Sequence, residues 1–158
     1  MADYEFLTTW CLAAPIEQVW DALYDSEHWP DWWRGVERVQ VIEPGDGDDR
    51  VGELARYTWR SRLPYRLEFD MRTLRVDRPY LVEGRAQGEL SGDGRWRLFE
   101  GRDATAVTYE WKVETTERWM NALAPLARPV FGWNHDWVMR RGGEGLARRL
   151  GVPLLVSG

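Results

Sequence analysis

The sequence predicts an α+β protein in which a strongly curved antiparallel sheet wraps around a long C-terminal helix. Two observations predict this fold class. Apolar and polar residues alternate with period two through most of residues 36–115, and turn residues interrupt the alternation at short intervals. Beyond residue 117 the apolar spacing becomes helical and continues to about residue 150. The 158 residues contain neither a repeat nor a linker, so we expect a single domain over residues 1–158.

The N-terminal part is predicted to form one strand followed by two short helices. Residues 4–13 alternate, which is typical of a strand. Pro15 stands at the first position of a helix, where proline is best tolerated, and apolar residues follow it at helical spacing through Leu23. The Trp-rich stretch 28–33 predicts a second short helix or a tight turn. Both helices therefore lie between the first and second strands.

Six further strands are predicted between residues 36 and 114, which gives a sheet of seven. Clusters of Gly, Pro and Asp separate them, and such short connections between successive strands favour an antiparallel meander. The predicted strands are Val36–Glu43, Glu53–Arg62, Tyr65–Val76, Tyr80–Leu90, Arg95–Glu100 and Ala104–Glu114, and the main turns are Pro44–Asp48, Asp77–Pro79, Ser91–Gly94 and Gly101–Asp103.

The two faces of this sheet differ in kind. Leu67, Phe69 and Met71 point one way from their strand, whereas the charged residues between them point the other way. The same alternation recurs around Trp59 and Trp111. One face is therefore apolar and aromatic, and we expect the other to be a solvated grid of opposite charges that pair across strands.

The C-terminal segment 117–150 is predicted to be helical. Pro125 and Pro129 interrupt the pattern, so we expect a short helix or turn first and the main helix from about Pro129. From there to Leu150 the helix spans about 33 Å, enough to lie across the whole sheet. Its apolar stripe consists of Phe131, His135, Val138, Met139, Gly142, Leu146 and Leu150.

Composition excludes several classes of function. A net charge of −5 and a pI of about 5.1 argue against general affinity for nucleic acid. The single cysteine, Cys11, excludes an internal disulfide and a cysteine-based zinc site, and we expect neither a metal nor a cofactor. Residues 1–9 lack the features of a signal peptide, and no segment has the ~20 apolar residues of a membrane span. We therefore expect a cytoplasmic protein.

The segment between the first two strands resembles a known family. Residues 14–25, Ala-Pro-Ile-Glu-Gln-Val-Trp-Asp-Ala-Leu-Tyr-Asp, precede the Trp-rich turn at 29–33. This combination resembles the opening of the START/polyketide cyclase-dehydrase superfamily, also called SRPBCC or helix-grip proteins. The resemblance implies a helix-grip fold, with a seven-stranded sheet around the C-terminal helix and a ligand cavity between them. The superfamily includes aromatase/cyclases, lipid, sterol and quinone binders and chaperone activators, and fold alone does not choose among these.

Several residues point to the same cavity. Gly84, Ala86 and Gly88 occupy alternate positions of one predicted strand, so they point to the same face of the sheet, and they carry almost no side chain. Gly142 likewise lacks a side chain on the apolar stripe of the helix. These small residues either leave space or allow the sheet to bend and the helix to pack closely, and the two interpretations are compatible. Aromatic walls around such a space suit planar ligands. The predicted ligand-binding residues are Tyr57, Trp59, Leu67, Phe69, Met71, Gly84, Ala86, Trp96, Leu98, Tyr109, Trp111, Phe131, His135, Val138, Met139 and Gly142.

His135 is the candidate catalytic residue because it is the ionisable residue placed on the apolar stripe of the helix. In a functional role it would act as acid or base near neutral pH, or orient a carbonyl or hydroxyl group of a ligand. In a structural role it would hydrogen-bond a buried group and do no more. The structural interpretation is the simpler one because the sequence assigns His135 no partner.

Three functions are compatible with these features. The leading hypothesis is that the protein binds a small hydrophobic, aromatic or polycyclic metabolite in the cavity. The alternative is a polyketide cyclase/aromatase-like enzyme that promotes aldol cyclisation and dehydration, chiefly by holding one reactive conformer. The second alternative is a chaperone-activator-like interaction protein. In that case Trp133 and Trp137, one turn apart on the helix, would be exposed, and they are also a candidate contact for a homodimer.

Overall fold

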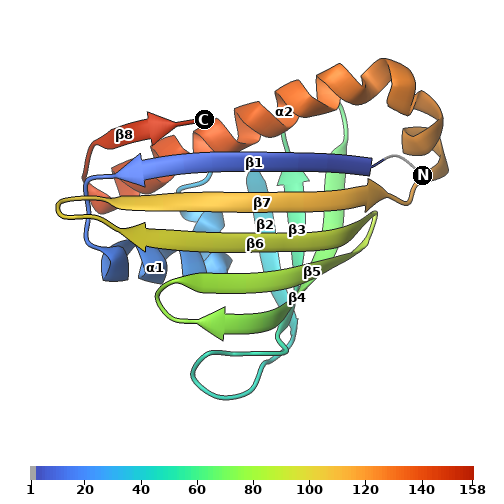
Figure 1. The fold of residues 1–158 in the computed structure, drawn as a ribbon. Coiled ribbons are helices and arrows are strands. Elements are labelled where there is room, and N and C mark those ends of the chain that lie inside the picture. Colours follow the sequence, from blue (N-terminus) through green and yellow to red (C-terminus); the bar gives the residue numbers. More distant parts are fainter. Residues whose placement is uncertain (1–2) are drawn as a thin grey trace.

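The computed structural model describes residues 3–158, except for the side chains of residues 119, 120, 123, 124, 126 and 127. A single curved antiparallel sheet wraps around one side of a long helix, α2, which crosses the top of the molecule in Figure 1. The elements in chain order are β1 (Asp3–Leu12), α1 (Ile16–Tyr24), the 3-10 helix η1 (Ser26–Asp31), β2 (Val36–Glu43), β3 (Leu54–Arg60), β4 (Arg66–Asp77), β5 (Leu81–Gly88), β6 (Leu90–Glu100), β7 (Thr105–Thr115), α2 (Arg118–Leu150) and β8 (Leu154–Ser157).

The fold class and the meander are confirmed, and the predicted strand count needs one correction. The strand order is β2-β3-β4-β5-β6-β7-β1-β8, so consecutive strands pair from β2 to β7 and β1 closes on β7. The sheet has eight strands rather than seven, because β8 pairs antiparallel with the free edge of β1. Gly151 ends α2 in the left-handed conformation at φ 68°, which turns the chain back toward that edge.

The prediction that the two prolines separate a short helix from the main one is wrong. Helix α2 begins at Arg118 and contains both Pro125 and Pro129. Each proline removes one backbone hydrogen bond and bends a helix without necessarily ending it. The N-terminal part of α2 accordingly curves away from the axis of the rest (Figure 1).

The predicted turn at Ser91–Gly94 is also wrong, because these residues lie inside β6. The chain reverses instead at Gly88, where φ is 113°. The two glycines of the segment allow close approach to the next strand. A Cβ on Gly92 would lie 2.0 Å from the backbone oxygen of Lys112, and one on Gly94 would lie 2.6 Å from the hydroxyl of Tyr109. The glycines therefore serve strand packing at this point.

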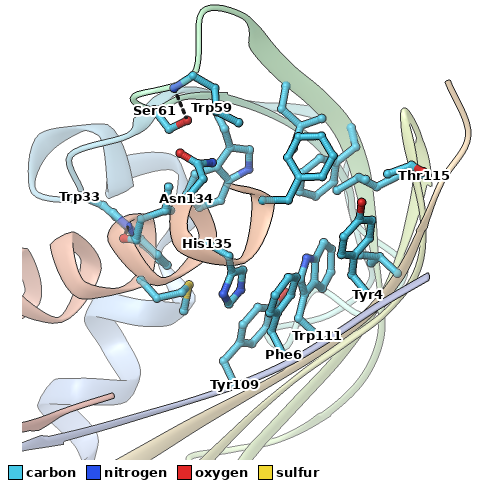
Figure 2. Close-up of a pocket in the computed structure, with 18 of the residues that line it drawn as sticks. Tyr4, Phe6, Trp33, Trp59, Ser61, Tyr109, Trp111, Thr115, Asn134 and His135 are labelled. Atoms are coloured by element: carbon cyan, nitrogen blue, oxygen red, sulfur yellow. Dashed lines mark hydrogen bonds between the residues drawn. The ribbon is translucent and has the colours of Figure 1, made fainter. Parts of the chain in front are cut away.

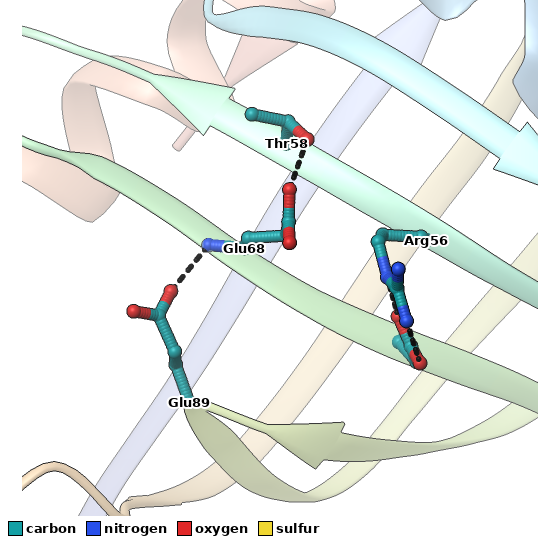
Figure 3. A network of polar contacts seen from close by, with 5 residues as sticks. Arg56, Thr58, Glu68 and Glu89 are labelled. Atoms are coloured by element: carbon teal, nitrogen blue, oxygen red, sulfur yellow. Dashed lines mark hydrogen bonds and ion pairs between the residues drawn. The ribbon is translucent and has the colours of Figure 1, made fainter.

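The outer face of the sheet is the grid of paired charges that the alternation predicts. Arg56 donates two hydrogen bonds to Asp70, its partner across β3 and β4, at 2.8 and 3.2 Å (Figure 3). Beside this pair the hydroxyl of Thr58 donates to Glu68 at 3.0 Å. Exposed pairs of this kind contribute about 0–1 kcal/mol each, so the grid keeps this face hydrated more than it stabilises the fold.

The inner core forms where α2 touches Trp10 of β1 and Trp33, which lies between η1 and β2. The indole nitrogen of Trp33 donates to the backbone oxygen of Val138 at 2.9 Å, and that of Trp10 donates to the oxygen of Met139 at 3.1 Å. Both rings are almost fully buried. These bonds fix the height of the helix above the sheet, and the space on the N-terminal side of this contact is where the candidate site lies.

Candidate ligand-binding site

A cavity opens between the sheet and α2, under the loop that joins β3 to β4 (Figure 2). The space open to the centre of a water molecule is ≈ 150 Å³. One water needs about 10–15 Å³ of such space, so the cavity can hold roughly ten waters. Ten waters occupy about 300 Å³ in the liquid, which is the corresponding volume available to a ligand. That lies at the lower end of the range for small-molecule sites. The volume suits a ligand of two or three fused rings.

Aromatic side chains make up most of the cavity wall. Tyr109 and Trp111 of β7 stack at 5.7 Å between ring centroids, and Tyr109 stacks on Trp96 at 4.1 Å. From the helix, Phe131 meets Tyr4 of β1 edge-on at 5.7 Å. The full lining is Tyr4, Phe6, Trp29, Trp33, Trp59, Ser61, Leu63, Tyr65, Leu67, Phe69, Leu90, Trp96, Tyr109, Trp111, Val113, Thr115, Phe131, Asn134, His135, Val138 and Met139.

His135 points into this cavity from α2 (Figure 2). Its ring stacks on Phe6 with centroids 4.0 Å apart and planes 12° from parallel. Its side chain is 13% exposed, and burial lowers the pKa of His135 to about 4. The imidazole is therefore neutral at pH 7 and presents one donor and one acceptor.

Polar atoms without a partner gather in this otherwise apolar space. Neither ring nitrogen of His135 has a hydrogen-bond partner among the described residues, since the carboxylate of Asp136 lies 3.9 Å away. The same is true of the hydroxyl of Tyr4, the indole nitrogen of Trp59 and the amide oxygen of Asn134. Buried polar groups are nearly always paired in folded proteins. These unpaired atoms give the cavity a set of hydrogen-bonding groups within its apolar wall.

The buried tyrosines are held in their neutral form. Burial raises the pKa of Tyr57 to about 12 and also raises the pKa of Tyr109. Tyr65, at the rim, has its pKa raised to about 12 by the same cause. At neutral pH these hydroxyls therefore stay protonated and can donate hydrogen bonds, but none is poised to lose its proton.

A second, smaller cavity (the lower cavity) adjoins the first (the upper cavity), and several side chains line both. The space open to water centres in it is ≈ 90 Å³. It is bounded by α1 and by polar residues near the β2–β3 loop, among them Arg50 and Glu53. The residues that line both cavities are Trp29, Trp59, Phe69, Trp96 and Tyr109.

The structure brings most of the predicted ligand-binding residues to one place. Those that line the upper cavity are Trp59, Leu67, Phe69, Trp96, Tyr109, Trp111, Phe131, His135, Val138 and Met139. Tyr57, Met71, Gly84 and Leu98 line the lower one. Ala86 and Gly142 line neither. Ala86 is buried among core side chains, and a Cβ on Gly142 would lie 2.5 Å from the ring of Trp33, so this glycine serves close packing.

Several residues of the cavity wall were not predicted from the sequence. Tyr4 and Phe6 share the inward parity of β1, a signal that was present in the alternation. Trp29 and Trp33 belonged to the family motif but were not placed in the wall. Ser61 and Tyr65 share the parity of Trp59 and Leu67 in the predicted strands, so alternation carried a signal for them, although the structure places both in the β3–β4 loop. For Leu63 the sequence carries no signal, because it lies between the predicted strands.

Trp133 and Trp137 differ in their surroundings. Trp133 is 51% exposed, whereas Trp137 is half-buried with the guanidinium groups of Arg34 and Arg141 within 6 Å of its ring. Contact between two copies of the chain through these residues remains a prediction.

Two negative findings apply to the described part of the chain. It contains no group of three or more His, Cys, Asp or Glu residues placed to hold a metal ion. Nor does it contain a helix both long and apolar enough to cross a membrane.

Comparison with known families gives a match over most of the chain. The model of the family described as polyketide cyclase/dehydrase and lipid transport matches residues 12–141. A search of curated proteins gave no match.

Solved structures share this architecture. The aromatase/cyclase Zhui from Streptomyces sp. R1128 superposes with a TM-score of 0.77 at 16% identity, over 95% of this chain and 94% of that chain. The protein TTHA0849 from Thermus thermophilus gives 0.79 at 17% identity, over 93% and 97%. Norcoclaurine synthase from Thalictrum flavum gives 0.61 at 14% identity, over 94% of both chains. At such identities the similarity establishes the fold.

Proposed function

Because this chain belongs to the polyketide cyclase/dehydrase and lipid transport family, we propose that its upper cavity binds a small aromatic or polycyclic metabolite bearing a hydroxyl or carbonyl group. The observation that carries this proposal is the set of unpartnered polar atoms on Tyr4, Trp59, Asn134 and His135 within aromatic walls. A bare hydrocarbon would leave these atoms unsatisfied, at a cost of about 1–3 kcal/mol for each. We place the protein and its ligand in the cytoplasm, consistent with the sequence.

The orphan atoms also indicate how the ligand is held. Neutral His135 can donate through one ring nitrogen and accept through the other, while the indole of Trp59 can only donate. A phenolic hydroxyl, which both donates and accepts, satisfies His135 in either tautomer. The ring of the same ligand packs on the aromatic walls, which adds about 0.5–1.5 kcal/mol per good contact beyond area burial.

A matched pair of ligands tests the proposal. Wild-type protein should bind 2-naphthol more tightly than 2-methylnaphthalene, as measured by quenching of tryptophan fluorescence. His135→Phe keeps the ring that stacks on Phe6 but removes both nitrogens. We expect this variant to bind 2-naphthol about tenfold more weakly and 2-methylnaphthalene within about twofold of wild type.

His28→Gln is the control, since the side chain of His28 is exposed and does not line the cavity. It should bind both compounds as wild type does. Failure of either compound to bind wild-type protein, or an equal loss for both in His135→Phe, would contradict the proposal.

A cyclase/aromatase-like enzyme is the second candidate. Zhui is named as an aromatase/cyclase, and the cavity offers a neutral imidazole and protonated tyrosines around an apolar space. It ranks second on chemical grounds. Proton transfer is most effective when the pKa of the catalytic group lies near the working pH. A histidine with a pKa of about 4 is a weak base at pH 7, better suited to hydrogen bonding than to removing a proton from carbon.

A further inference from the structure

A cleft with four arginines lies beside the mouth of the upper cavity. It is lined by Arg34, Arg60, Ser61, Arg62, Trp137 and Arg141. Three segments meet there. The amide of Arg60 donates to the backbone oxygen of Gly35 at 2.8 Å, and a Cβ on Gly35 would lie 3.9 Å from the ring of Trp137. The fold therefore gathers these cations from the segment between η1 and β2, the end of β3 with the β3–β4 loop, and α2.

The charge in this cleft is not balanced. Arg141 pairs with Glu144 at 2.8 Å, and its Nε is buried without a hydrogen-bond partner. Within the described part of the chain, no carboxylate lies within 4.0 Å of the guanidinium nitrogens of Arg34, Arg60 or Arg62. The outer face of the sheet is different, because arginines there face carboxylates across the strands. The protein as a whole has a net charge of −5, so an excess of positive charge at this one place suggests a specific role for these arginines.

Aromatic rings hold three of these arginines in place. The guanidinium carbons of Arg34 and Arg141 lie 5.9 and 5.5 Å from the ring centroid of Trp137, and that of Arg62 lies 5.7 Å from the ring of Trp133. Contact with an aromatic face orients a guanidinium and leaves its N–H donors free for another group. Such donors match a carboxylate, phosphate or sulfate in geometry and charge.

The cleft and the cavity are adjacent. Ser61 lines both, and it lies beside Trp59 and Asn134 at the upper edge of the cavity in Figure 2. On α2 the same flank passes from Asn134 in the cavity to Arg141 in the cleft. Seven residues make nearly two turns, so these positions share a face and lie about 10 Å apart.

We propose that the natural ligand is amphipathic, with its aromatic body in the cavity and an anionic group bound by the arginines of the cleft about 10 Å away. This inference rests on the proposed function, because it assigns a second part of the same ligand. The free donors of Arg34, Arg60 and Arg62 select the anion, and Ser61 marks the passage between the two parts.

Two dyes, a carboxylate and its uncharged methyl ester, test this inference. We would use 6-(dansylamino)hexanoate, whose carboxylate can reach the cleft, and its methyl ester, and follow dansyl fluorescence at low salt and at about 0.15 M salt. Wild-type protein should bind the acid more tightly than the ester at low salt, and the preference should shrink as salt rises. In Arg60→Gln/Arg62→Gln, affinity for the acid should fall at least about fivefold while that for the ester changes less than about twofold.

The control is Arg97→Gln/Arg102→Gln. It makes the same change in net charge at two exposed arginines outside the cleft, and it should leave both affinities unchanged. Equal affinity of wild-type protein for acid and ester, or an equal loss in the two double variants, would overturn the inference while leaving the pocket intact. If neither dye binds wild-type protein, the proposed function fails as well.

Discussion

At the scale of single residues, His135 is the polar group on which the proposed ligand site depends most. Helical spacing placed it on the apolar stripe, and the structure places it in the cavity, stacked on Phe6 and with both ring nitrogens unpaired. The sequence could not predict which residues contact His135. Its side chain is only 13% exposed, and its neighbours come from strands that are far away in the chain. For the same reason, alternation predicted which residues of β1 share a face, but it could not predict that Phe6 stacks on His135 of α2.

The pKa of His135 leads to a prediction about pH and stability. Burial holds this pKa near 4 in the folded chain, whereas an unfolded histidine titrates near 6.5. The unfolded state therefore binds the proton preferentially between these values, so stability is full above pH 6.5 and falls as the pH drops toward 4. Between about pH 7 and pH 5, wild-type protein should lose about 2 kcal/mol more unfolding free energy than His135→Gln, measured by urea denaturation.

His28 provides a control of opposite sign. Its hydrogen bond to Asp25 raises its pKa, so its contribution is present at low pH and lost as the pH rises. His28→Gln should therefore lose at least as much stability as wild type between about pH 7 and pH 5. An identical pH dependence for His135→Gln and wild type would show that the imidazole is not held neutral by burial.

At the scale of elements, the glycines near the end of α2 determine how closely the helix approaches Trp10 of β1 and Trp32, which follows η1. A Cβ on Gly145 would lie 1.8 Å from the backbone oxygen of Trp32, and one on Gly143 would lie 3.0 Å from Trp10. No larger residue fits there without moving the helix. Toward its N-terminal side, from Phe131 to Met139, the same helix lines the cavity instead. The C-terminal part of α2 therefore packs directly on the tryptophans, and the cavity lies beside its preceding part.

Two alanine substitutions on one helix test this arrangement. Gly145→Ala should reduce the free energy of unfolding by about 2–3 kcal/mol through overpacking. Gly132→Ala should raise it by up to about 1 kcal/mol, because no described atom outside its own helix turn lies within 4 Å and alanine is the better helix former. Thermal or urea denaturation measures both. Equal effects of the two substitutions would rule out close packing at Gly145.

The elements that the sequence predicted correctly are those with strong periodicity. Alternation over residues 66–77 and 105–115 gave β4 and β7 nearly to their ends, and Pro15 marked the start of α1. The prediction of a turn at Ser91–Gly94 failed because the residue types favoured a turn, whereas packing against the neighbouring strand favours a strand. Gly92 and Gly94 are typical of a turn, yet lie within β6 because the neighbouring strand leaves no room for a side chain.

At the scale of the whole molecule, the central feature is a sheet curved around a helix that touches it firmly only in part. Trp33 of the family motif and Trp10 of β1 make that contact, and the meander supplies aromatic walls from β3, β6 and β7. The sequence predicted the architecture because patterning and motif agreed. It could not establish that the interior is open, since this depends on distances among side chains that are far apart in the chain.

A crystal structure of the protein grown with 2-naphthol tests this account most directly. We predict that the naphthol rings lie between Trp111 and Phe131, with the hydroxyl within hydrogen-bond distance of His135 or Asn134. A structure in which the aromatic side chains close on one another, leaving no space and no bound naphthol, would contradict it.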